Sequence, residues 1–433
     1  MHILVRGALL TAACAGAYIL YKNFISEGRA TKAAEPRSAT QKTKEGDKAG
    51  DKRSTTESTA KTGGMGCFQS KKEEPPADET PIKKPKVETT APQQTNSSGI
   101  SDGSELFPKK KKLNYKDFQF MNEKGKVLIK EPGSVNGQPF NIGDCEDCDI
   151  YICDYIAQVQ IDECKNCRIF IGPTEASIFI RNCTGCKCIM ACRQYRAREC
   201  VDCDTLLYAS TAPVVEESKR MRFGCFRFFY FNLAQQLAEV KLSVFDNKWS
   251  EIYDFTPADG NWSFLPLDTK CADLMKPLSA VSSVTTKEEE EAHGETSVVP
   301  FTVGLRSKEF AGQPRAFVLL MPDKYEEGLK LFSAITDKSL VIIQTKELLL
   351  DPAKAKQLFQ KASNPALGAA LVKKMVVGAE IAGADALAIA QAAAQAGGGE
   401  AVAYVSASED GAAYESNLFF EQWKDFAGSS VTK

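Results

Sequence analysis

The residues best suited to chemistry lie in one short stretch, Arg193 to Arg198, which reads RQYRAR. Alternate side chains of a strand point to opposite faces, so Gln194, Arg196 and Arg198 are expected on one face. Guanidinium groups held on a strand can bind phosphate oxygens bidentately. The stretch therefore predicts either an anion-binding face or an ordinary solvated one. Glu216, further along the chain, either orients an arginine or is surface charge.

Histidine is scarce, since the 433 residues contain only His2 and His293. Mechanisms that need a histidine base, a phosphohistidine or several histidine metal ligands therefore have almost nothing to use. Any chemistry is expected to depend on Arg, Gln, Glu or Cys. The net charge of −2 argues against general nucleic-acid binding, which normally requires a basic domain.

Most of the 15 cysteines are periodic. Four C-x-x-C pairs begin at Cys145, Cys164, Cys183 and Cys200, at intervals of 19, 19 and 17 residues, with short alternating apolar segments between them. A period near 20 built from short strands, two or three of about five residues per repeat, is typical of a solenoid, and we predict a parallel β-helix. The pairs form either two structural zinc sites or, as we favour, a ladder of unmetallated thiols in the core.

The N-terminal residues 1–113 contain little that could form a core. Residues 3–21 are apolar apart from one arginine, and they fit a membrane span, a signal peptide, or upstream sequence wrongly joined to the protein. Residues 30–112 hold few large apolar side chains, so we predict that this linker is disordered.

Within this linker, residues 65–70 (MGCFQS) match the N-myristoylation motif M-G-x-x-x-[ST]. If translation begins at Met65, Gly66 is the site of myristate and Cys67 is placed for palmitate. Two acyl chains anchor a protein stably to a membrane, whereas one does not. If translation begins at Met1, the motif has no such role. We favour Met65.

The C-terminal third shows a different pattern. Residues 281–313 form a linker with an acidic run, and residues 314–433 alternate between strand-like and helix-like segments, which predicts an α/β or α+β domain. The predicted strands are 316–321, 340–345 and 401–405, and the predicted helices are 325–336, 352–362, 371–377 and 385–397.

Several motifs between about residues 114 and 267 resemble the tubulin cofactor C domain family. Besides the paired cysteines these are Ile180–Cys183, Ala191–Arg196, Pro213–Glu216, Phe223–Phe226, Leu242–Phe245, Trp249-Ser250 and Asp254–Pro257. The retinitis pigmentosa branch of the family also begins with Met-Gly-Cys, which matches residues 65–67 and supports the internal start. The resemblance covers most of residues 65–433. It implies a right-handed β-helix over 114–280 and members that activate small GTPases or act in tubulin folding.

The resemblance also assigns roles to individual residues. Arg196 matches the family's arginine finger, Gln194 an interface glutamine, Glu216 a functional interface glutamate, and Phe255 an aromatic residue at the GTPase contact. Arg193 stands where relatives commonly have glutamine, so the role of that position is open.

Together these features predict an activator of an Arf-like small GTPase in its GTP form, with Arg198 as a further partner-binding residue. No cofactor is expected, because GTP and magnesium belong to the partner. The acyl chains imply a lipid-anchored protein at the cytoplasmic face of the plasma membrane and the base of a cilium or flagellum, in the trafficking of lipidated proteins. The alternatives are a non-catalytic scaffold or a tubulin-folding cofactor.

The C-terminal domain resembles nucleoside diphosphate kinase in that branch, which implies a ferredoxin-like fold. Residues 314–433 contain no histidine to carry the phosphoryl group. We therefore expect the kinase fold without the kinase activity.

Overall fold

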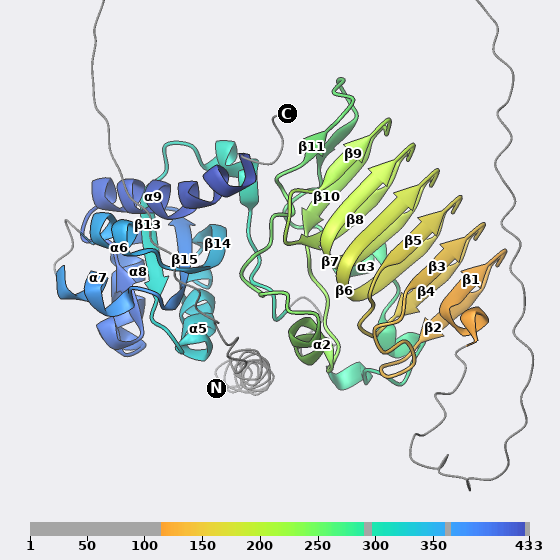
Figure 1. The fold of residues 1–433 in the computed structure, drawn as a ribbon, viewed down its shortest axis with the longest axis horizontal. Helices are drawn as coiled ribbons and strands as arrows, with labels where there is room; N and C mark the ends of the chain where they lie inside the picture. Colours follow the sequence, from red (N-terminus) through yellow and green to blue (C-terminus); the bar gives the residue numbers. More distant parts are fainter. Residues whose placement is uncertain (1–113, 290–296, 360–364, 429–433) are drawn as a thin grey trace, which may run out of the picture. The chain divides into compact units, whose positions relative to one another are not determined.

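The computed structural model describes residues 114–289, 297–359 and 365–428 (Figure 1). Its first part is a 12-stranded sheet in which every pair of neighbouring strands is parallel, wound into a β-helix as the cysteine period predicts. The apolar segment 3–21 and the lipidation motif 65–70 lie outside the described residues. The strands are β1 (Gln119–Met121), β2 (Val127–Lys130), β3 (Phe140–Gly143), β4 (Asp149–Ile152), β5 (Val159–Asp162), β6 (Arg168–Arg181), β7 (Lys187–Arg198), β8 (Asp204–Ala209), β9 (Val214–Glu216), β10 (Met221–Cys225), β11 (Tyr253–Asp254) and β12 (Trp262–Phe264).

The strands form two walls. One wall contains β1, β3, β5, β9 and β11, the other contains β2, β4, β8, β10 and β12, and the long strands β6 and β7 bend round a corner and belong to both. The prediction of strands of about five residues is therefore wrong for β6 and β7, which have 14 and 12 residues. The pairing of β6 with β7 shifts register twice through the bend, between Ile171 and Thr174 and between Thr174 and Ser177. In this bend a side chain on Gly172 would collide with the carbonyl oxygen of Asp154.

The cysteine pairs mark a second set of corners. The residue before each first cysteine, such as Glu163 or Glu199, has a positive φ, which turns the chain sharply. The thiol of Cys200 then donates a hydrogen bond to the carbonyl oxygen of Arg198, two residues earlier, at 3.3 Å. In all eight cysteines of the C-x-x-C pairs, the thiol donates a hydrogen bond to the backbone carbonyl oxygen two residues earlier. One rung later Ser218 replaces cysteine and its hydroxyl makes the equivalent bond at 2.8 Å.

These thiols therefore act as buried local hydrogen-bond donors. Every cysteine of the described segments is a free thiol, and the same residues contain no group of three or more Cys, His, Asp or Glu side chains placed to hold a metal ion. Burial raises the pKa of the Cys148 and Cys153 thiols, which keeps them protonated at neutral pH. The hydrogen bonds of the thiols to these carbonyl oxygens are those expected of the thiol ladder, which stays a prediction.

Two short helices lie near the end of the β-helix: α2 (Leu233–Glu239) between β10 and β11, and α3 (Cys271–Leu274) after β12. Helix α2 is attached to the β-helix through a buried polar network. Gln236 donates from its amide nitrogen to the Cys153 carbonyl oxygen at 3.1 Å and accepts from the Tyr230 hydroxyl. A buried amide with both ends hydrogen-bonded avoids the cost of desolvation and fixes the position of the helix.

The C-terminal domain has a four-stranded antiparallel sheet in the order β14-β15-β13-β16. This order, with one helix after β13 and another after β15, is the β-α-β-β-α-β arrangement of ferredoxin-like domains, so the predicted ferredoxin-like fold is confirmed. Its elements are β13 (Arg315–Leu320), α5 (Tyr325–Thr336), β14 (Val341–Leu349), α6 (Pro352–Leu358), α7 (Pro365–Leu371), β15 (Met375–Ala382), α8 (Ala386–Ala396), β16 (Ala403–Val405) and α9 (Glu409–Gly428).

Both faces of this sheet are covered. Val318 of β13 packs in one core with α5 and α8, and its neighbour Phe317 packs in the opposite core with α6 and α9. The predicted helix over 371–377 is wrong, because β15 begins at Met375. Val376 and Val377 point into opposite cores, with the period of two that a central strand requires. Of the helices in the described part of the chain, none has the length and apolarity needed to cross a membrane.

Candidate functional site

Strand β7 presents the predicted Gln-x-Arg-x-Arg face. Tyr195 and Ala197 are buried, Arg196 and Arg198 are exposed, and Gln194 is half-buried, so the alternation expected from the sequence is confirmed. The strand is paired on both sides in this region, with β6 before it and β9 after it. The backbone that carries these side chains therefore belongs to the interior of a wall and has little freedom to move.

The Arg196 guanidinium makes no hydrogen bond or ion pair with any residue that the structure describes. The other two arginines on the same wall, Arg181 and Arg198, both form ion pairs. Arg181, one rung earlier, binds Asp162 through two hydrogen bonds of 2.6 and 2.8 Å, which raise its pKa. Arg198 lies 3.2 Å from the Glu199 carboxylate and 3.7 Å from that of Glu217.

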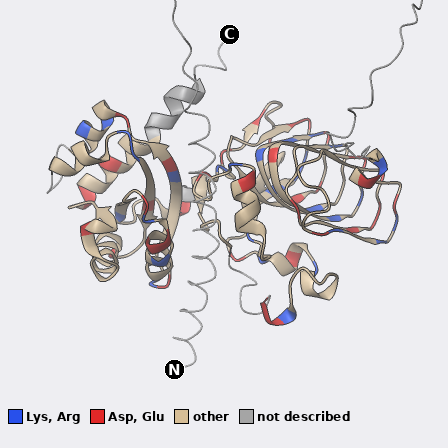
Figure 2. Cartoon of the chain, turned by 60° about the horizontal axis from the view of Figure 1, so that its bottom comes forward, with Lys and Arg blue, Asp and Glu red and all other residues tan. Residues whose placement is uncertain are grey.

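Paired charges are the rule along the β-helix. Figure 2 shows Lys and Arg beside Asp and Glu on successive rungs. Arg220 and Arg222 each bind an aspartate one rung earlier. Against this pattern, the exposed and unpaired Arg196 is the cation of this wall that remains available to an anionic partner.

Arg196 stands in a column of apolar side chains. The strand register places Phe179 beside it on one side and Val214 on the other, and Tyr253 beside Val214 on the next rung. Tyr253 and Phe255 are 49% and 56% exposed, and their rings meet edge to face with centroids 4.8 Å apart. The surface next to the free guanidinium is thus apolar and aromatic, as binding surfaces often are.

Glu216 was predicted either to orient an arginine or to be surface charge. It pairs through its backbone with Arg198, but within the described residues its carboxylate forms no ion pair with Arg196 or Arg198. Arg198 binds its neighbours Glu199 and Glu217 instead. Glu216 therefore lies on the same wall as Arg196, half-buried, and does not orient either arginine in this structure.

Arg193 has a structural role. Its Nε donates to the Glu175 carbonyl oxygen at 2.8 Å, and its terminal nitrogen donates to the Val240 carbonyl oxygen at 3.3 Å. Val240 is the C-cap of α2, so a cation there complements the helix dipole. Arg193 ties α2 to the corner of the β-helix and points away from the face that carries Arg196.

Two residues of the site escaped the sequence analysis. Ser177 donates a hydrogen bond to the Oε1 atom of Gln194 at 3.0 Å, and Tyr253 extends the aromatic surface next to Phe255. Tyr253 could have been found by alternation, because it precedes Phe255 by two residues. The pairing of Ser177 with Gln194 required the strand register, which the uneven repeat length hides.

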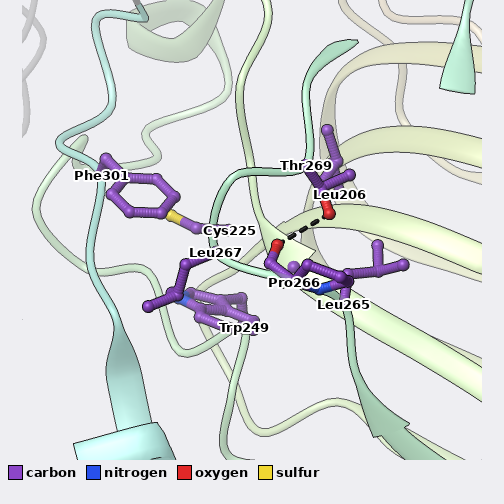
Figure 3. Close-up of a pocket in the computed structure, with 9 residues that line it drawn as sticks. Leu206, Cys225, Trp249, Leu265, Pro266, Leu267, Thr269 and Phe301 are labelled. Carbon is purple, nitrogen blue, oxygen red and sulfur yellow. Dashed lines mark hydrogen bonds between the residues drawn. The ribbon is translucent and has the colours of Figure 1, made fainter. Parts of the chain in front are cut away.

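One small cavity lies next to the last strands of the β-helix. The cavity in Figure 3, between Leu206, Cys225, Trp249 and Phe301, has a volume of about 10 Å³. This is room for one water molecule, and its lining is mostly apolar.

In the C-terminal domain the buried Glu415 accepts hydrogen bonds of 2.7 Å from Tyr404 and Ser406, so this carboxylate is satisfied internally.

Comparison with known proteins gives consistent matches. The family model described as tubulin binding cofactor C matches residues 137–255. Protein XRP2 of Danio rerio is 40% identical over 313 residues, covering 68% of this chain and 82% of the relative. Protein XRP2 of Homo sapiens is 40% identical over 301 residues, covering 69% and 81%.

Two solved structures match parts of the chain. Tubulin binding cofactor C from Leishmania major is 22% identical, with a TM-score of 0.25, and covers 34% of this chain and 88% of that one. The nucleoside diphosphate kinase of Aquifex aeolicus is 19% identical, with a TM-score of 0.22, and covers 24% and 94%. At such low scores, the fold assignment depends on the strand orders described above.

Proposed function

We propose that this chain, which belongs to the XRP2 family of proteins with a tubulin binding cofactor C domain, activates GTP hydrolysis by an Arf-like small GTPase. The observation that carries the proposal is the exposed Arg196 guanidinium, which has no partner among the described residues while Arg181 and Arg198 beside it are paired. The Arf-like class of the partner comes from the resemblance of the β-helix motifs to that family.

The chemistry of phosphoryl transfer suits this arrangement. Such reactions require positioning and stabilisation of charge on the transferred group, and an arginine supplied in trans contributes ~10³–10⁵ in rate. The planar, always charged guanidinium can bind two phosphate oxygens at once. Because Arg196 has no ion pair to break, it can reach a bound nucleotide without losing an interaction. GTP and magnesium would be held by the GTPase, so the chain needs no cofactor of its own.

The apolar column would bind the GTPase around the finger. Tyr253 and Phe255 offer exposed aromatic surface on one side of Arg196, and the half-buried Phe179 lies on the other. When a partner covers such surface, water leaves the site and the charge interaction of the guanidinium becomes stronger. We assign Gln194, Arg198 and Glu216 to the same interface.

Membrane attachment forms a separate part of the proposal. Gly66 and Cys67, outside the described residues, would carry myristate and palmitate in a chain that begins at Met65. This would place the activator at the cytoplasmic face of the plasma membrane and the base of a cilium or flagellum, in the trafficking of lipidated proteins. The ferredoxin-like domain would then serve a role other than phosphotransfer, because it contains no histidine.

The direct test is multiple-turnover GTP hydrolysis by the Arf-like GTPases of the source organism, each assayed with the full chain. Arg196→Ala should reduce the stimulation by about 10³-fold or more while the complex still forms. Arg181→Ala is the matched control, because Arg181 lies on the same wall and is already neutralised by Asp162. Full stimulation by Arg196→Ala would refute the assignment.

A second candidate follows from the matched family model, whose description names tubulin binding. In that case the chain would be a tubulin-folding cofactor or a scaffold without a finger. It would retain tubulin in a pull-down, and Arg196→Ala would bind its partner and act as well as the unaltered chain.

A further inference from the structure

We infer that Ser177 is a positioning residue that holds the Gln194 amide beside Arg196. The inference rests on the proposed function, in which this wall meets a GTPase. Ser177 lies on β6 directly opposite Gln194 on β7, and its hydroxyl donates to Gln194 Oε1 at 3.0 Å. Ser177 is only 8% exposed, so water competes poorly for this hydrogen bond.

The hydrogen bond decides what Gln194 can offer to a partner. A glutamine amide has one acceptor oxygen and two N–H donors. With the oxygen engaged by Ser177, the nitrogen is left as the end that can bind something else. A free glutamine side chain would have to lose rotamer freedom when a partner docks, whereas one already held by Ser177 has lost much of that freedom beforehand.

Gln194 and Arg196 then present the same kind of group. They are two residues apart on one strand and on the same face, roughly 7 Å apart along the backbone. Both offer N–H donors, and the acceptor oxygen of Gln194 is already engaged by one hydrogen bond from Ser177. The ligand that complements this pair is a surface rich in acceptor oxygens, such as phosphate oxygens, carboxylates and backbone carbonyls around a bound nucleotide.

The kinetic test uses the full chain with a GTP-loaded Arf-like GTPase. Ser177→Ala should reduce kcat/KM about three- to tenfold, the ordinary effect of losing one neutral hydrogen bond, and should lower the melting temperature by no more than about 2–4 °C per kcal/mol lost. In a Gln194→Ala background it should cause no further loss. Ser210→Ala is the matched control, because the Ser210 hydroxyl donates to the Arg193 carbonyl oxygen at 3.4 Å and not to the Gln194 side chain. Additive losses from the two substitutions would overturn the inference.

Gln194→Glu tests which end of the side chain faces outward. The carboxylate can still accept from Ser177, but it has no donor left for a partner. We expect it to be at least as impaired as Gln194→Ala, and wild-type kcat/KM in this variant would overturn the inference.

A second measurement separates this inference from the proposed function. In the free ¹⁵N-labelled chain, the Gln194 side-chain amide signals are identified by their absence in Gln194→Ala. They should shift and show greater mobility in Ser177→Ala and stay unchanged in Ser210→Ala. Unchanged signals in Ser177→Ala would overturn the positioning role. Failure of the proposed function would show differently, as an unaltered chain that gives no Arg196-dependent stimulation of any GTPase.

Discussion

Replacing single cysteines by serine should separate the thiol ladder from a zinc site. At Cys200 the new hydroxyl can donate to the Arg198 carbonyl oxygen, which the thiol now contacts at 3.3 Å. Ser218, one rung later, already makes the equivalent bond at 2.8 Å. Cys188 is equally buried, with 1% exposure, but its thiol has no hydrogen-bond partner among the residues described.

The magnitudes follow from that difference. Cys200→Ser keeps an acceptor and should cost under about 1 kcal/mol. Cys188→Ser buries a hydroxyl without a partner and should cost about 1–3 kcal/mol. For a domain of this size, each kcal/mol lowers the melting temperature by roughly 2–4 °C. We therefore expect a loss of about 2–12 °C for Cys188→Ser and under about 4 °C for Cys200→Ser.

The assay is thermal unfolding of the full chain followed by tryptophan fluorescence, to which Trp249 and Trp262 contribute from the β-helix. The zinc interpretation predicts the reverse order, because Cys200 would be a metal ligand and Cys188 would not. A greater loss for Cys200→Ser than for Cys188→Ser would refute the thiol ladder. Two zinc ions per chain in the purified protein would refute it as well.

Three further predictions concern other parts of the chain. The buried hydroxyl of Tyr195 has no hydrogen-bond partner among the described residues, so Tyr195→Phe should leave the unfolding free energy unchanged or raise it by about 1 kcal/mol, measured in urea; a fall of more than about 1 kcal/mol would contradict this prediction. Burial raises the pKa of Glu415, so its contribution to stability is complete below about pH 4 and is lost as the pH rises through the raised pKa. Glu415→Gln, which imitates the protonated acid, should therefore melt higher than the unaltered chain at pH 7 and alike at pH 4, and equal melting temperatures at pH 7 would oppose this. In cells that express the chain from Met65, Gly66→Ala should move the protein from the membrane to the soluble fraction, because the single site of myristate is lost; unchanged sedimentation would argue against the lipid anchor.

Much of the fold could be predicted from short-range patterns. The intervals between cysteine pairs indicated stacked rungs, and the alternation from Gln194 to Arg198 indicated which side chains face outward. The first pattern depends on the length of one rung, and the second on the period of two that the backbone imposes along any strand. The pattern of apolar residues gave a wrong prediction where its spacing fits both a helix and a strand. Residues 371–377 resemble a helix turn by turn, and only the pairing of β15 with β13 and β14 makes that segment a strand.

The sequence by itself determined the rungs, the outward face of β7 and the lack of histidine in residues 314–433, which argues against phosphohistidine chemistry there. Only the tertiary structure decided which arginine is free. Arg181, Arg196 and Arg198 are chemically alike and lie on one wall, but the ion pairs of Arg181 with Asp162 and of Arg198 with Glu217 join residues on neighbouring rungs, each pair 19 positions apart in the sequence. Such a pair depends on the exact register of two strands, and so does the bond between Ser177 and Gln194. Register is set by how whole rungs stack, because a shift of one residue would turn every side chain to the other face.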